Sequence, residues 1–231
     1  MRKNEELKFE YTFEFDNSKT VHFTIQLDPT TLNYVPAKKP QTADWAKLDN
    51  EKCENCPLNS QEHPHCPIAL NLVNILPEFS DLFSYEEAVI TVKTPDRDFS
   101  AHTSLQRGLG SMLGIYMVSS GCPIMAKLKP MVRFHLPFAS VEETIFRSAS
   151  THLMGQYFKN KKGLKPDWTL DGLTNIYKEV QKVNLAMADR LRSLQAKDAN
   201  INALIVLDVF AKELPINIEN SLEPLAYLFE E

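Results

Sequence analysis

Cysteine and histidine side chains cluster in one short stretch of this chain. Three of the four cysteines, Cys53, Cys56 and Cys66, fall within fourteen residues, and His63 and His65 lie between the second and the third. Two cysteines separated by two residues can grip one tetrahedral metal centre through their thiolates. The stretch therefore predicts a metal site.

A structural zinc ion takes four protein ligands, so the three clustered cysteines need a fourth. Cys122 is remote in the sequence but stands between a glycine and a proline, which is a usual setting for a ligand. His65 directly precedes Cys66, and both could reach one ion only in a bent loop. His63 has easier geometry but is stiffened by the proline that follows it. We expect the ligands to be Cys53, Cys56, Cys66 and Cys122, with His65 or His63 as substitutes for the last.

Two other interpretations of the cysteines stay open. The four-cysteine set also suits an iron–sulfur cluster, whose bacterial motifs commonly carry Cys-Pro, and Cys56, Cys66 and Cys122 each precede a proline. Alternatively, no metal binds and the cysteines are buried thiols. A redox-active pair needs a strand and a helix around it, whereas Cys56 runs into a polar loop. Zinc is the expected cofactor, and an iron–sulfur cluster is the alternative.

A second group of residues could carry acid–base chemistry. Residues 127–136 predict a strand, which would deliver His135 beside a helix start that bears Glu142 and Glu143. Such a meeting is one way to build the general acid–base site of a hydrolase. Structural roles explain the same residues, because Ser140 and Glu143 match a capping box and His135 fits a half-buried strand position. The chain holds no nucleophile elbow, phosphate-binding loop or dinucleotide fingerprint, so the sequence decides neither for nor against an enzyme.

Length and composition indicate one globular domain over residues 1–231. Hydrophobic residues make up 43% of the chain and charged residues 24%, which excludes a wholly disordered protein. A net charge of −5 disfavours binding to nucleic acid by bulk attraction. The chain has no signal-peptide core and no run of ~20 apolar residues. We expect a cytoplasmic protein that binds neither nucleic acid nor membranes, with a protein partner left open.

The elements that must position these residues predict an α+β fold. Alternating apolar and polar residues on both sides of a turn predict an antiparallel β-hairpin within residues 1–35. Residues 36–66 form a long polar cysteine and histidine loop, which is unusual inside a compact domain and which a bound metal would order. Residues 67–139 mix helices with a strand at 88–93, and residues 140–231 form a mainly helical C-terminal half.

Helical periodicity predicts helices over 104–119, 140–158, 170–194 and 203–210, and a short last helix within 222–229. The first of these contains Gly108, Gly110 and Gly114. Each glycine is unfavourable by about 1 kcal/mol relative to alanine in a helix interior. Close packing of this helix against other backbone, or a ligand passing there, would offset that cost.

Residues 53–72, 119–123 and 131–147 are similar to segments of a bacterial family of unknown function whose members are stand-alone proteins of this length. The resemblance covers most of the chain. It implies a bacterial cytosolic protein, and it brings no fold, substrate or catalytic residue with it. The sequence as a whole predicts a soluble metal-binding protein with a structural zinc ion and an interaction or regulatory role.

Overall fold

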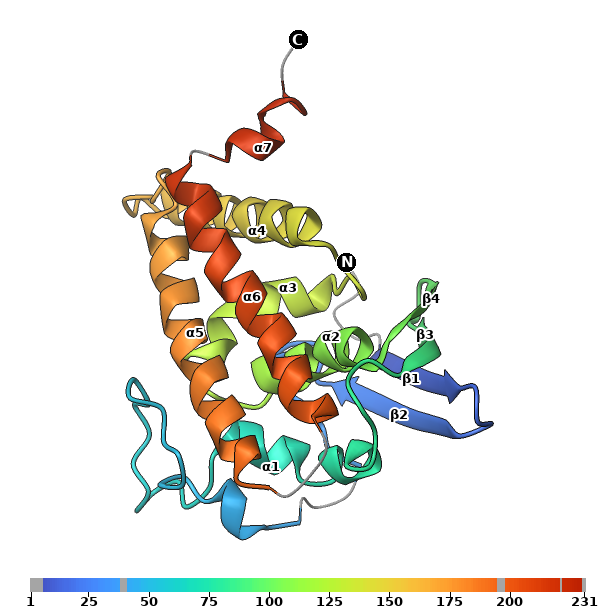
Figure 1. The fold of residues 1–231 in the computed structure, drawn as a ribbon. Coiled ribbons are helices and arrows are strands. Elements are labelled where there is room, and N and C mark those ends of the chain that lie inside the picture. The colour runs from blue at the N-terminus through green and yellow to red at the C-terminus, as the bar shows by residue number, and fades with distance from the viewer. Residues whose placement is uncertain (1–5, 38–40, 195–197, 221, 230–231) are drawn as a thin grey trace.

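A computed structural model describes residues 6–37, 41–194, 198–220 and 222–229. A four-stranded antiparallel sheet is built from the N-terminal half of the chain, and the C-terminal half is helical (Figure 1). The predicted α+β fold is confirmed. No helix within the described ranges is long and apolar enough to cross a membrane.

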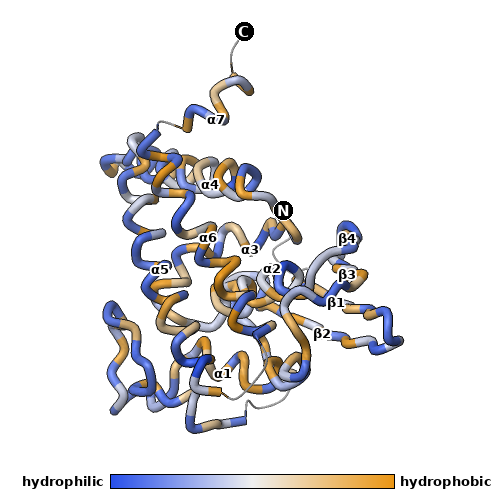
Figure 2. Tube along the Cα trace, in the orientation of Figure 1, coloured by the Kyte–Doolittle hydropathy of each residue, from blue (hydrophilic) through white to orange (hydrophobic). Residues whose placement is uncertain are grey.

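The sheet has the strand order β2-β1-β3-β4. β1 (Leu7–Phe15) and β2 (Thr20–Leu27) form the predicted hairpin, and every second residue of β1 is buried. Figure 2 shows the same alternation of hydrophobic and hydrophilic residues along both strands. β3 (Glu87–Lys93) matches a predicted strand. β4 (Asp98–Ser104) was not expected, because its polar composition hides the alternation of a strand.

The helices pack on one another and on the sheet. α5 lies along α6, and α2 packs between α6 and the sheet (Figure 1). The bounds of the helices are α1 (Pro67–Leu72), α2 (Leu105–Val118), α3 (Lys129–Arg133), α4 (Val141–Lys161), α5 (Asp171–Arg192), α6 (Ala199–Glu219) and α7 (Glu223–Ala226). Short 3-10 helices span Asp44–Ala46, Leu76–Phe79 and Met125–Leu128.

The strand predicted over residues 127–136 is wrong. The segment instead contains the end of the 3-10 helix Met125–Leu128 and then α3. Pro130 lies in the first turn of α3, where the missing N–H of a proline leaves no helical hydrogen bond unmade. His135 therefore follows a short helix and does not end a strand.

Close packing explains two of the three glycines in α2. A Cβ atom at Gly108 would overlap with Cδ1 of Ile90, and one at Gly110 would lie 3.2 Å from the carbonyl oxygen of Ala203. At Gly114 the nearest atom would be 3.6 Å away, in Leu207. The helix thus approaches β3 and α6 closely at its first two glycines and leaves ordinary space at the third.

α4 begins with the predicted capping box. The side-chain oxygen of Ser140 accepts a hydrogen bond from the N–H of Glu143 at 3.1 Å, and the Glu143 carboxylate accepts one from the N–H of Ser140 at 2.8 Å. Ser104 occupies the equivalent position before α2 but makes no side-chain cap bond. The two serines therefore differ in what their hydroxyl groups contribute.

We expect Ser140→Ala to lower the free energy of unfolding by about 1 kcal/mol, because the variant loses the bond that satisfies a free N–H at the start of α4. Ser104→Ala removes the same hydroxyl from a helix start without breaking a cap bond, so its effect should be smaller. Urea denaturation of both variants measures the difference. Equal losses would contradict the role of the capping box.

Candidate functional site

The cysteine loop, defined here as residues 41–66, is fastened to α5 by one buried arginine. Nη1 of Arg190 donates hydrogen bonds to the carbonyl oxygens of Trp45 at 2.6 Å and Lys47 at 2.7 Å. Its Nη2 reaches those of Leu48 and Glu51 over longer distances of 3.5 and 3.4 Å. Only 1% of Arg190 is exposed, so its charge is held inside the protein by these carbonyl groups. In Figure 1 the loop lies at the lower end of α5.

Further contacts join the loop to the middle of α5. The side-chain amide of Asn55 donates to the Glu179 carboxylate at 2.6 Å and to the Glu179 carbonyl oxygen at 3.1 Å. Lys182 forms an ion pair with Glu54 at 2.9 Å. Both residues of that pair are well exposed, so it contributes little to stability. The amide contacts of Asn55 and the carbonyl contacts of Arg190 are what place the loop.

The four cysteines come from three parts of the fold. Cys53 and Cys56 lie in the loop and are half-buried, and the N–H of Cys56 donates to the carbonyl oxygen of Cys53 at 3.0 Å in a tight turn. Cys66 directly precedes α1, and Cys122 follows the end of α2; both are buried. All four are free thiols.

The electrostatics of Cys53 indicate that these thiols share one neighbourhood. Burial, joined by the charges of Cys66, Cys122 and Cys56, raises the pKa of Cys53 to about 12, while the charge of Arg190 acts in the opposite direction. Such interactions weaken with separation, so they require the groups to lie near one another. The remote Cys122 is thus among the partners of Cys53.

Cys122 lies in a backbone turn that presents N–H groups to its sulfur. Burial raises the pKa of Cys122, and hydrogen bonds from the backbone N–H groups of Met125 and Ile124 act against that rise. Cys66 and Cys56 add to the rise through their charges. N–H donors stabilise the thiolate form of a cysteine, which is the form that binds a metal.

The thiols are nevertheless not in a ligating arrangement. Within the ranges that the structure describes, no three His, Cys, Asp or Glu side chains are placed so that they could hold a metal ion. The donor set itself suits a soft tetrahedral ion, because it consists of four free thiols. The buried Nε atom of Arg190 has no hydrogen-bond partner, and an anionic thiolate centre would balance its charge. His63 is exposed, and the backbone of His65 pairs with that of Lys47, which leaves both imidazoles as predicted substitutes for the fourth ligand.

His135 meets hydroxyl groups and not the two carboxylates of the predicted acid–base site. Its Nε2 atom lies 2.8 Å from the phenol oxygen of Tyr11 and 3.3 Å from Oγ of Ser111. Glu143 is used in the capping box, and Glu142 accepts a hydrogen bond from a tyrosine near the C-terminus. The structure therefore separates the roles of the three residues.

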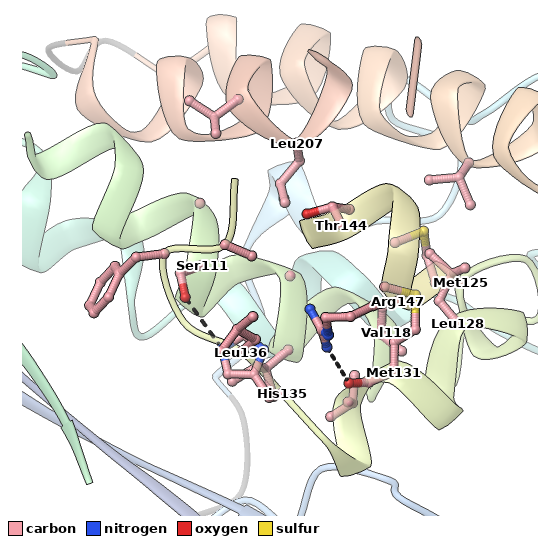
Figure 3. Close-up of a pocket in the computed structure, with 18 of the residues that line it drawn as sticks. Ser111, Val118, Met125, Leu128, Met131, His135, Leu136, Thr144, Arg147 and Leu207 are labelled. Carbon is pink, nitrogen blue, oxygen red and sulfur yellow. Dashed lines mark hydrogen bonds between the residues drawn. The ribbon is translucent and has the colours of Figure 1, made fainter. Parts of the chain in front are cut away.

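The surroundings of His135 make it a poor general base. Burial, joined by the charge of Arg147, lowers the pKa of His135 to about 3. A general base works best when its pKa is near the working pH, so an imidazole this acidic transfers protons weakly at neutral pH. His135 and Ser111 instead line a cavity of about 150 Å³, which the sequence did not predict (Figure 3).

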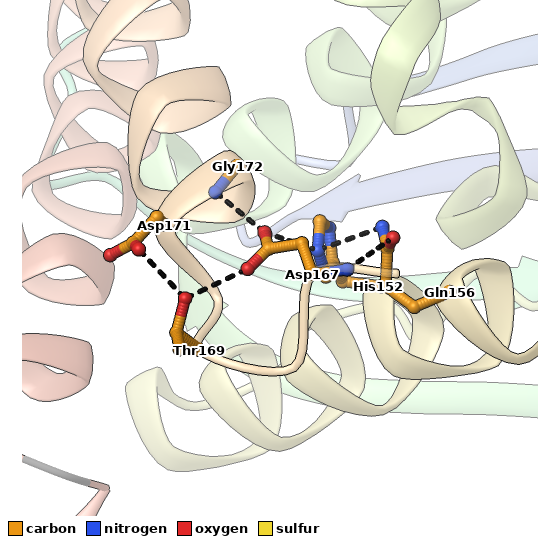
Figure 4. A network of polar contacts seen from close by, with 6 residues as sticks. All are labelled: His152, Gln156, Asp167, Thr169, Asp171 and Gly172. Carbon is orange, nitrogen blue, oxygen red and sulfur yellow. Dashed lines mark hydrogen bonds and ion pairs between the residues drawn. The ribbon is translucent and has the colours of Figure 1, made fainter. Parts of the chain in front are cut away.

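A second polar network is structural. His152 lies 3.2 Å from the Asp167 carboxylate and 3.0 Å from the side-chain nitrogen of Gln156 (Figure 4). The same carboxylate accepts hydrogen bonds from the N–H of Gly172 at 2.7 Å and the hydroxyl of Thr169 at 2.9 Å. These bonds fasten the start of α5 to α4, so His152 has a structural partner that the sequence did not reveal.

Fold and cysteines together define an α+β protein in which a cysteine loop is fastened to a helical half. The chain belongs to the family described as Domain of unknown function (DUF6901), whose model matches residues 9–230. This confirms the resemblance to a family of unknown function. Neither the curated proteins nor the solved structures include a match to this chain.

We expect Arg190→Met to lower the free energy of unfolding by about 3 kcal/mol, because it removes the charge-assisted hydrogen bonds by which a buried guanidinium joins α5 to the cysteine loop. The matched control is Arg192→Met, since Arg192 is exposed and contacts only Asp189 among the described residues. That control should change stability by less than about 0.5 kcal/mol. Urea denaturation measures the stability of both variants, and limited proteolysis measures how readily residues 41–66 are cleaved in each. Similar losses in both variants would contradict the role given to Arg190.

His135 should make the protein less stable in acid. Its pKa is about 3 in the folded protein against an ordinary 6.5, so below pH 6.5 the unfolded chain binds a proton that the folded chain does not. The free energy of unfolding should therefore fall with decreasing pH between about 6.5 and 3, by at most about 1.4 kcal/mol per pH unit from this group. His135→Gln should reduce that slope in urea denaturation. An unchanged slope would show that His135 is not buried in its neutral form.

Proposed function

We propose that this protein carries a structural metal ion, zinc, on the thiolates of Cys53, Cys56, Cys66 and Cys122, and that it acts as an interaction or regulatory module in the cytoplasm. The observation that supports the proposal is that two of the four free thiols, one in the loop and one after α2, lie within electrostatic reach of the other cysteines. Besides burial, the charges of Cys66, Cys122 and Cys56 raise the pKa of Cys53, and those of Cys66 and Cys56 raise the pKa of Cys122, although Cys122 lies far along the chain. The sequence of the cysteine loop does not by itself bring Cys122 near the other three cysteines.

Zinc would supply order to a loop that has little of its own. The only regular element in residues 41–66 is the 3-10 helix Asp44–Ala46, and the buried apolar side chains before Cys66 are Ala46 and Leu48. An ion shared between this loop and the end of α2 would tie them together. Because the thiols are not in a ligating arrangement, binding requires their side chains to rearrange. The free energy of binding to the folded chain then adds to stability.

Other functions have less support. An iron–sulfur cluster uses the same four cysteines, so the donor set alone does not separate it from zinc. A hydrolase centred on His135 has less support because, in the part of the chain that the structure describes, the imidazole bonds to the hydroxyl groups of Tyr11 and Ser111 and to no carboxylate. A reducing cytoplasm keeps clustered thiols available for a metal, which agrees with four free cysteines.

Elemental analysis of the purified protein tests the proposal. We expect one zinc ion per chain, lost in Cys122→Ser and kept in the control His63→Ala, which alters an exposed histidine of the same loop. At about a hundred times the dissociation constant, zinc adds about 2.7 kcal/mol, so chelation should lower the melting temperature by roughly 5–10 °C. If the purified protein is brown and contains iron and sulfide, the cysteines hold an iron–sulfur cluster and the zinc proposal is wrong. A metal-free chain whose melting is unaffected by added zinc would refute a metal site.

A further inference from the structure

A cavity of about 150 Å³ lies between α2, α3, α4, α5 and α6 (Figure 3). Apolar side chains make up most of its wall, including Ile115, Val118, Met131, Val180, Val206 and Leu207. Its volume is similar to that of a core cavity in which a protein holds benzene. The apolar part of a fitting ligand is therefore about the size of one ring or a short aliphatic chain.

Arg147 contributes a cation with free donors to this wall. Nη2 of Arg147 donates to the carbonyl oxygens of Met131 at 3.0 Å and Phe134 at 2.9 Å. A guanidinium has five N–H donors, so three remain on Nη1 and Nε; none of them bonds to a described residue, and none is among the buried unpaired atoms, so a ligand can reach them. No described carboxylate forms an ion pair with Arg147, although the charge of Glu143 acts on it. Figure 3 shows the guanidinium reaching in among the labelled lining residues.

Asn184 contributes an unpaired amide to the same wall. It is 2% exposed, and neither its side-chain nitrogen nor its side-chain oxygen has a hydrogen-bond partner. In Asn55 and Asn200, by contrast, the side-chain oxygen is buried and unpaired, but the side-chain nitrogen donates a hydrogen bond. An unpaired buried polar group costs free energy, so it calls for an explanation such as a ligand.

We propose that this cavity binds a small apolar monocarboxylate. Its ring or chain occupies the apolar part, and its carboxylate accepts hydrogen bonds from Arg147 and from the amide nitrogen of Asn184. A charged guanidinium selects an anion over a neutral ring, and the N–H groups left on Nη1 and Nε can each donate a charge-assisted hydrogen bond to it. The exposed cation Arg107 also lines the cavity and favours entry of an anion. The small volume and apolar walls exclude a nucleotide.

The probes are benzoate and toluene, which share a ring and differ in the carboxylate. Titration calorimetry and ligand-observed NMR on the full chain should show saturable binding of benzoate, with toluene at least about tenfold weaker because it lacks the charge-assisted hydrogen bonds. Binding of toluene as tight as that of benzoate would overturn the carboxylate assignment. Absence of saturable benzoate binding at millimolar concentration would overturn the proposal as a whole.

Two glycine variants locate the site. Gly114 lines the cavity, and a Cβ atom there meets Leu207 at an ordinary 3.6 Å, so Gly114→Ala fills space without a clash. Gly155→Ala is the matched control, because Gly155 lies in α4 away from the cavity with nothing within 4 Å of the added atom. Both variants gain the same helix propensity. Benzoate affinity should fall in Gly114→Ala alone; equal affinity in the two variants would refute the location.

Asn184→Leu separates binding from folding. The change removes an unpaired buried amide, so the melting temperature should stay the same or rise while benzoate affinity falls about tenfold. A fall in melting temperature with unchanged benzoate affinity would assign Asn184 to the fold and overturn its role in the cavity. The metal content of this variant should equal that of the wild type, so failure here is distinct from failure of the zinc proposal.

Discussion

The cysteine loop depends on one buried guanidinium. Burying a cation is costly unless its hydrogen bonds are well made, and Arg190 makes them to carbonyl oxygens of a segment far away in sequence. The carbonyl groups of an irregular loop equally need donors once they leave water. Arg190 and residues 45–51 thus bind each other, and these bonds together with those of Asn55 to Glu179 set the position of Cys53 and Cys56 relative to α5.

α2 connects the two candidate sites. Gly108 permits its close approach to the sheet on one side, and Gly110 permits its close approach to α6 on the other. Beyond its end the chain turns at Gly121, which has φ +93, and delivers Cys122 toward the cysteine loop. Ser111 and Gly114, in the same helix, line the cavity. The placement of α2 therefore determines both the fourth thiol and one wall of the cavity.

The sequence predicted what depends on local periodicity. The hairpin, α5 and the capping box at Ser140 all carry a strong regular pattern, and the structure confirms each of them. β4 has too few apolar residues to show alternation. The segment of α3 predicted a strand because a helix of five residues is too short to show helical periodicity. Arg190 could have been suspected, because it falls within the apolar stripe of α5 beside Leu191. That Arg147 and Asn184 line the same cavity could not have been predicted, because they lie on different helices and no sequence spacing links them.

The unpaired amide of Asn184 is not a requirement of packing. Its neighbours along the buried face of α5 are apolar, as Val180, Val183 and Met187 illustrate, and a leucine would satisfy the same helical pattern. An amide there lowers stability by roughly 1–3 kcal/mol when it remains unbonded. An unpaired buried polar group that lowers stability is often found where a ligand or a reaction needs it. The combination of this amide with the free donors of Arg147 therefore distinguishes the cavity from an ordinary packing defect.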